Sequence, residues 1–263
     1  MKDRAMISQP RSPFTFWITL LVLIFLYLPI FVLVISSFND SRFGGEWSGF
    51  TFKWYQRLWN EYRMWEALGN SLIIAISATI ASTFIGTCAA FALHSYKSKL
   101  QKMHYGLIYV PLIIPDILTG ISLLIFFIAI NIHLGLFTIF IAHTTFCVSY
   151  VTMVMLSKLQ NFDFTVIEAA QDLGANTWTV IHRILFPLLA PGLSAGALLA
   201  FILSIDDFVI TYFVTGQGVA TLPVYVYTMI KFGSTPIVNA LSVIILVVTF
   251  IIIFISQKLS KEN

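Results

Sequence analysis

Residues 158–192 read KLQNFDFTVIEAAQDLGANTWTVIHRILFPLLAPG and separate two long apolar segments. The first part of this stretch, 164–173, favours a short helix, because residues 168–171 are good helix formers. Gly174 then supplies the left-handed residue with which many helices end. The stretch therefore predicts a short helix that stops at a glycine corner.

A second short helix is expected beyond that corner. Asn176 or Thr177 can cap its start, and Pro187 is expected to end it, because proline lacks a backbone N–H. Apolar side chains gather on one face of each helix: Val166, Ile167, Ala170 and Leu173 on the first, and Trp178, Ile181 and Leu185 on the second. The pattern predicts two amphipathic helices; a plain surface loop resting against a membrane is the alternative.

The composition of the whole chain points to a membrane protein. Its 263 residues are 58% hydrophobic and only 10% charged, whereas soluble domains carry roughly 25% charged residues. The net charge of +3, without a basic patch interleaved with aromatic residues, argues against nucleic acid as a partner. These values predict an integral membrane protein surrounded by lipid.

Neither the cysteines nor the histidines form a recognisable metal or haem motif. Cys88 and Cys147 lie far apart and show no CxxC spacing, so a zinc or iron–sulfur site has no support. His143 is the only histidine deep in an apolar run, and a haem held by two axial histidines would need a second one. We therefore expect this chain to bind no cofactor and no metal.

Long apolar segments predict an all-α fold that crosses the membrane repeatedly. A spanning helix needs about 20 mostly apolar residues. The qualifying stretches are about 14–38, 70–94, 105–130, 136–157, 192–214 and 237–256, which gives six transmembrane helices. The first stretch has too long an apolar core for a signal peptide, so we expect it to remain as a helix.

The distribution of lysine and arginine orients these helices. The short loop 95–104 carries Lys97, Lys99 and Lys102 and no acidic residue, which is typical of a cytoplasmic loop. Both termini and the stretch 158–191 are then expected on the cytoplasmic side. The outer loop 39–69 contains several tryptophans, which favour the headgroup region, and we expect it to be partly helical.

Three acidic residues lie inside the predicted spans, where no lysine or arginine occurs: Asp116, Asp206 and Asp207. A charged side chain at the bilayer centre costs roughly 2.5–3.5 kcal/mol even on the lenient insertion scale. Counted from the cytoplasmic ends of their helices, all three are expected near the midplane. They must be protonated, hydrated in a cavity, or paired with a partner subunit or a cationic ligand.

The position of each acid on its helix suggests a role. In a continuous helix over 192–214, small and polar residues share one face: Gly192, Gly196, Ala200, Ser204, Asp207, Thr211 and Thr215. Such a face serves helix packing, or, with its carboxylate, a water-filled pathway. Asp207 lies in this stripe, whereas Asp206 lies off its edge and could instead bond a neighbouring helix. Asp116 follows Pro115 in a helix that prolines should break, so it either caps the restarting helix or lines a cavity.

The stretch 158–192 resembles the "EAA" motif of type I ATP-binding-cassette (ABC) importer permeases. Residues Glu168, Ala169 and Ala170 are followed after three residues by Gly174, and after nine more by Ile184 and Pro187, with Phe186 where leucine is usual. The resemblance implies that this loop is the coupling helix that docks on a cytoplasmic ATPase. The residues assigned to coupling are Glu168, Ala169, Ala170, Asp172, Gly174, Ile184 and Pro187.

Further short motifs resemble the permease subunits of spermidine/putrescine importers over nearly the whole chain. They are SSFN at 36–39, PDI at 115–117, AHTTFC at 142–147, DDFV at 206–209, FVTG at 213–216 and VNAL at 238–241. The resemblance implies a permease domain over 66–257 with five helices. Residues 1–65 would add an N-terminal tail, the first helix and the outer loop, and 258–263 a cytoplasmic tail.

A polyamine substrate would suit the intramembrane acids, because carboxylates bind ammonium groups through charge-assisted hydrogen bonds and aromatic faces add cation–π contact. The candidate pathway residues are Asp207, Asp206, Asp116, Ser204, Thr211 and Tyr212, with Phe208, Tyr225 and Tyr227 as further aromatic candidates. The chain has no GxxxxGK[ST] motif, so we expect no ATP hydrolysis by this subunit itself.

The resemblance implies three kinds of protein partner. They are a second permease subunit, an ATPase dimer that holds ATP and Mg, and an extracytoplasmic polyamine-binding protein. Two alternatives stay open: an ABC importer permease for another cation or small solute, and an ion-coupled secondary transporter that uses the acids as an ion site.

Overall fold

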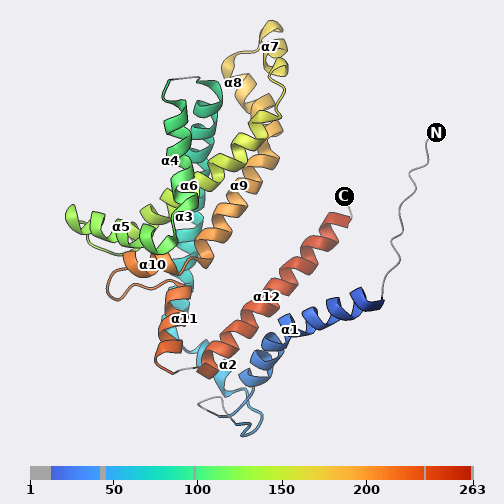
Figure 1. Cartoon of the computed structure of the whole chain (residues 1–263), viewed down its shortest axis with the longest axis vertical. Helices are drawn as coiled ribbons and strands as arrows, with labels where there is room; N and C mark the ends of the chain where they lie inside the picture. The colour runs from blue at the N-terminus through green and yellow to red at the C-terminus, as the bar shows by residue number, and fades with distance from the viewer. Residues whose placement is uncertain (1–12, 42–45, 97–98, 234, 262–263) are drawn as a thin grey trace. The chain divides into compact units, whose positions relative to one another are not determined.

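The structure is a computed structural model that describes residues 13–41, 46–96, 99–233 and 235–261 (Figure 1). The described residues form helices, joined by loops that include one isolated antiparallel bridge between Asn39 and Phe50. This confirms the all-α prediction. The chain divides into two compact units: a terminal unit, Met1–Tyr62 with Thr228–Asn263, and a central unit, Arg63–Tyr227.

The terminal unit contains α1 (Pro13–Ser37), α2 (Lys53–Trp59) and α12 (Thr235–Lys261), with α12 packed against the other two helices. Asn39 organises the loop between α1 and α2, since its side-chain oxygen accepts the backbone N–H of Ser48 at 3.0 Å. The indole N–H of Trp54 donates to the Asn39 carbonyl at 2.7 Å. The expectation that the stretch 39–69 is partly helical is thus confirmed by α2.

The central unit is built around α6. The helices that lie wholly or mostly in it are α3 (Tyr62–Ser95), α4 (Gln101–Ile113), α5 (Asp116–Ala129), α6 (Leu136–Gln160), α7 (Thr165–Asp172), α8 (Thr177–Val180), a π-helix (Ile181–Leu185), α9 (Phe186–Asp206), α10 (Val209–Val214) and α11 (Leu222–Lys231). Helix α6 packs against α4, α9 and α10, while α5 packs against α10. The arrangement brings the α9–α10 junction next to both α5 and α6.

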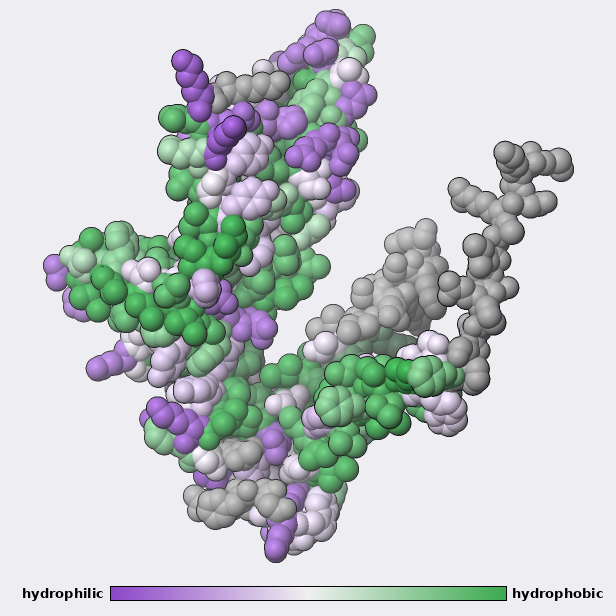
Figure 2. Space-filling view, in the orientation of Figure 1, coloured by the Kyte–Doolittle hydropathy of each residue, from purple (hydrophilic) through white to green (hydrophobic). Residues whose placement is uncertain are grey.

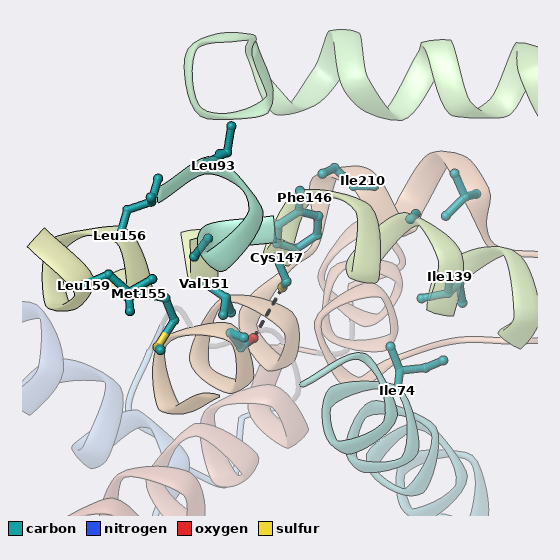
Figure 3. Packing of buried hydrophobic residues seen from close by; sticks show 14 of the residues in the cluster. Ile74, Leu93, Ile139, Phe146, Cys147, Val151, Met155, Leu156, Leu159 and Ile210 are labelled. Carbon is teal, nitrogen blue, oxygen red and sulfur yellow. Dashed lines mark hydrogen bonds between the residues drawn. The ribbon is translucent and has the colours of Figure 1, made fainter. Parts of the chain in front are cut away.

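Helix α6 supplies half of the buried residues of the central core cluster, because its side chains are covered on several sides. Ile139, Cys147, Val151 and Met155 are fully buried (Figure 3). The thiol of Cys147 contacts the carbonyl of Ala200 on α9 at 3.6 Å, the dashed line in Figure 3. Such a close approach is possible because α9 presents small residues to α6.

The length and apolar character of the described helices allow four membrane spans: Phe14–Ser37, Tyr62–Ser95, Leu136–Gln160 and Thr177–Asp206. The pair α4 and α5 makes a fifth if it is one span, although the two helices are bent by 108°. The break that we predicted at Pro115 is therefore confirmed. The sixth predicted span, about 237–256, falls within α12, where the apolar stretch Pro236–Ile251 is shorter than a full span, so a count of six remains a prediction.

The predicted continuous helix over 192–214 is wrong. Helix α9 ends at Asp206, and Asp207 is extended, with φ −66° and ψ 122°. The Asp207 carboxylate accepts the backbone N–H groups of Ile210 and Thr211, at 3.3 and 2.8 Å, in the first turn of α10. Side-chain bonds of this kind compete with the helical ladder, which explains the break.

The prediction that Pro187 ends a loop helix is also wrong. A helix runs from Thr177 to Asp206, and Pro187 lies within it, in the first turn of α9 directly after a π-helix. The five residues before α9 form the π-helix Ile181–Leu185. This wider turn lets the chain pass the proline, whose ring would otherwise clash with the carbonyl four residues earlier.

Gly216→Ala is expected to destabilise the central unit, because the new Cβ would overlap the backbone carbonyl of Leu134. Crowding of this kind costs about 1–3 kcal/mol, so the melting temperature of the purified protein in detergent should fall. Gly106→Ala in α4 is the matched control, since a Cβ there meets open space and alanine favours a helix. Equal melting temperatures for the two variants would contradict the close approach at Gly216.

Candidate functional site

The three intramembrane acids meet at one cavity of about 280 Å³ within the central unit. Asp116 comes from the start of α5, whereas Asp206 and Asp207 come from the α9–α10 junction. The packing of α5 against α10 brings these distant parts of the sequence together. Phe146 and Tyr150 of α6 form another part of the wall.

Asp206 and Asp116 are the exposed acids of this cavity. Asp206 is the last residue of α9 and is exposed, although the sequence pattern put it off the edge of the polar stripe. Asp116 is the first residue of α5, and the capping position before it is taken by Pro115 without a side-chain cap. The negative charge of Asp116 at a helix N-terminus is favourable, and its side chain remains open to the cavity.

Asp207 is held by the protein itself. Its side chain is 9% exposed, and one carboxylate oxygen accepts both the hydroxyl and the backbone N–H of Thr211, at 2.7 and 2.8 Å. The same oxygen lies 3.3 Å from Nε2 of His143. Asp207 therefore borders the cavity, while its carboxylate accepts hydrogen bonds from the first turn of α10.

His143 is the residue that the sequence analysis missed. It is buried on α6, where Nδ1 lies 2.7 Å from Oγ of Ser204 and Nε2 lies 2.8 Å from Oγ1 of Thr211. A signal was present, since His143 is the only histidine deep in an apolar run, but we used it only to argue against haem. We refer to His143, Ser204, Asp207 and Thr211 as the histidine network.

The other predicted pathway residues lie beside the cavity. Ser204 and Thr211 are buried and bonded to His143. Tyr212 is partly exposed, and its ring centroid lies 5.5 Å from that of Phe208 and 5.6 Å from that of Tyr227. Phe208 lines the cavity and also contacts Tyr227 at 4.7 Å, so an aromatic cluster adjoins the acids.

The segment between α6 and α9 has the corner that the sequence predicted. Gly174 has φ +84°, which confirms the left-handed end of α7. The side chain of Asn176 accepts the N–H of Thr179 at 2.8 Å, which confirms the cap of the second helix. At the start of α7, hydrogen bonds from the hydroxyl and N–H of Thr165 lower the pKa of Asp163.

The predicted coupling residues lie on an exposed surface. Glu168 and Ala169 in α7, and Asp172 at its end, are exposed, and Ala170 is half-buried. Leu173 is 89% exposed and Trp178 is 72% exposed, so apolar side chains stand between hydrophilic ones at this end of the central unit (Figure 2). Ile184 lies in the π-helix and Pro187 in the first turn of α9, so both continue the helix toward the cavity.

Comparison with protein families gives a match over most of the chain. The pattern of the family described as "Binding-protein-dependent transport system inner membrane component" matches residues 82–261. The chain belongs to this family. As a member, it is an inner-membrane transport component and a permease subunit, not an enzyme.

Curated relatives of this permease are similar over nearly their full length. "Spermidine/putrescine transport system permease protein PotC" of Escherichia coli (strain K12) is 40% identical over 239 residues, 91% of this chain and 90% of the relative. PotC of Haemophilus influenzae is 38% identical over 253 residues, 96% of this chain and 97% of the relative. "Putrescine transport system permease protein PotI" of E. coli (strain K12) is 40% identical over 264 aligned positions, which cover 96% of this chain and 94% of the relative.

Solved structures show the same fold at low sequence identity. A chain of a bacterial ABC transporter involved in the import of alginate has a TM-score of 0.71 at 19% identity, covering 95% of this chain and 98% of that one. A chain of the MetNI methionine ABC transporter has a TM-score of 0.60 at 17% identity, covering 78% and 96%. The permease fold expected from the EAA motif is thereby confirmed.

Proposed function

We propose that this permease forms half of the translocation pathway of an ATP-driven polyamine importer that carries spermidine or putrescine. The observation that supports this most is the convergence of Asp116, Asp206 and Asp207 on one cavity. A hydrated cavity through which a cation passes offsets the cost of placing carboxylates inside a membrane. The names of the relatives, PotC and PotI, point to the same substrates.

The wall of the cavity suits a flexible chain that carries two or more ammonium groups. Asp116 and Asp206 are open to bind ammonium groups through charge-assisted hydrogen bonds. The ring of Phe208 adds a face for cation–π contact. A neutral solute would leave these carboxylates without a counter-charge, which favours a cationic substrate.

The importer requires further subunits. The family description names dependence on a binding protein, and one solved neighbour is a bacterial alginate transporter in complex with a periplasmic protein. We assign this permease an extracytoplasmic polyamine-binding protein and a second permease subunit that completes the pathway. An ATPase dimer that holds ATP and Mg would dock on the segment containing Glu168 and Gly174, and this chain would bind no cofactor.

A permease for another cation or small solute is the second candidate, because the fold is shared by importers of alginate and methionine. An ion-coupled secondary transporter fits less well, since the chain belongs to a family that depends on binding proteins.

Competition for uptake separates these possibilities. Cells carrying the complete importer are expected to take up radiolabelled spermidine, and excess putrescine should inhibit this uptake, whereas ferric iron and neutral amino acids should not. Uptake should also stop when the ATPase is inactivated, even while the proton gradient is intact. A lack of inhibition by any polyamine would contradict the assigned substrate.

A further inference from the structure

The histidine network joins three helices at the point where the pathway helix breaks. The His143 side chain, on α6, is 1% exposed. Its hydrogen-bond partners are Ser204 in the last turn of α9 and Thr211 in α10. Asp207 occupies the break between those two helices and borders the cavity.

The hydrogen bonds around Thr211 assign the proton on the imidazole ring. The Thr211 hydroxyl has one hydrogen, and it donates that hydrogen to the carboxylate of Asp207 at 2.7 Å. Its oxygen must therefore accept the contact from His143 at 2.8 Å, which places a hydrogen on Nε2. Nδ1 bonds the Ser204 hydroxyl at 2.7 Å, and every member of the network has a partner.

We propose that His143 is a positioning residue for the cation pathway. Through its Nε2–H it fixes Thr211 and Asp207, and so sets where α9 ends and where the neighbouring Asp206 faces the cavity. The network thereby gives the two adjacent acids different roles. The Asp207 carboxylate is hydrogen-bonded within the protein, whereas the Asp206 carboxylate is available to bind the passing cation. The effect on uptake rests on the proposed function, whereas the coupling of His143 to Asp207 does not.

Two amide substitutions test which ring nitrogen matters. In His143→Gln the amide nitrogen can take the place of Nε2 and donate to Thr211, whereas in His143→Asn the shorter amide takes the place of Nδ1 and reaches only Ser204. Loss of one hydrogen bond to a charged group corresponds to about a tenfold change in an equilibrium constant, and here in the half-saturating concentration of the solute. The half-saturating concentration of radiolabelled spermidine should rise about tenfold in His143→Asn and stay within about twofold of wild type in His143→Gln.

Cys147 provides a control on the same helix. Cys147→Ala alters α6 one turn further on and removes a contact with α9 outside the network, so the half-saturating concentration should not change. A purely structural role would lower the amount of permease in the membrane in both amide variants, without separating their half-saturating concentrations. An equal or larger rise in His143→Gln than in His143→Asn would overturn the proposal.

A second measurement uses no solute and decides the proposal even if spermidine is not the substrate. The purified importer is unfolded thermally as wild type, His143→Asn, Asp207→Asn and the double variant. Coupled residues in one network give non-additive effects. We expect the melting temperature of the double variant to fall by less than the sum of the decreases in the two single variants. Additive shifts would overturn the positioning role, whereas absence of spermidine uptake by wild type would contradict only the proposed function.

Discussion

Glu168→Lys is expected to abolish uptake while the permease stays in the membrane. Glu168 is exposed in α7, away from the core, so the substitution should leave the fold intact. A reversed charge at a docking contact costs several kcal/mol, and 3 kcal/mol is about a hundredfold in affinity for the ATPase. Co-purification of the ATPase with the tagged permease measures the loss directly, and uptake of radiolabelled spermidine measures its consequence.

Glu66→Lys is the matched control for this experiment. It makes the same charge reversal at an exposed position near the start of α3, in the stretch 39–69 that we predicted to lie on the outer side. The ATPase should co-purify with Glu66→Lys as it does with wild type. Normal co-purification and uptake with Glu168→Lys would refute the docking role of α7.

The coupling segment could be predicted closely because its structure depends on local rules. Gly174 adopts a left-handed conformation that glycine tolerates, and Asn176 caps the helix that follows it. Each of these signals is carried by one residue and its immediate neighbours. The end of the second helix was predicted wrongly because the effect of Pro187 depends on the π-helix before it, which leaves no comparable local pattern.

The break after Asp206 could not be predicted from periodicity. The sequence around it remains apolar at helical spacing, so a continuous helix agrees with the local pattern. The extended conformation at Asp207 depends on the hydrogen bond that its carboxylate accepts from Thr211. It also depends on His143 of α6, which bonds Ser204 of α9, a residue 61 positions later in the sequence. A bond across such a separation is fixed only when α6 and α9 pack together.

The meeting of the acids at one cavity could be predicted only in part, because it depends both on local sequence and on the packing of distant helices. Depth along each helix placed Asp116 at the same level as Asp206, and the break at Pro115 was visible in the sequence. That the two carboxylates share a cavity depends on the 108° bend between α4 and α5 and on the packing of α5 against α10. Which acid faces the solute is therefore a property of the folded chain.

Asp206→Asn is expected to impair the uptake of a cation more than any conservative change of the cavity wall. The variant keeps the shape of an exposed side chain and removes its charge, so the permease should be present in the membrane in normal amount. An ammonium group loses a charge-assisted hydrogen bond of about 1.5–3 kcal/mol, which raises the half-saturating concentration about ten- to a hundredfold. Initial rates of radiolabelled spermidine uptake over a range of concentrations measure this shift.

The comparison with Asp206→Glu and Asp207→Asn separates charge from structure. Asp206→Glu keeps the carboxylate in the open cavity, so its half-saturating concentration should stay within about threefold of wild type. Asp207→Asn disturbs a carboxylate oxygen that accepts two bonds from Thr211, so its melting temperature should fall together with uptake. Asp206→Asn should instead lose uptake at an unchanged melting temperature, because its carboxylate is left to the solute. Wild-type uptake kinetics in Asp206→Asn would show that the cation takes another route past the cavity.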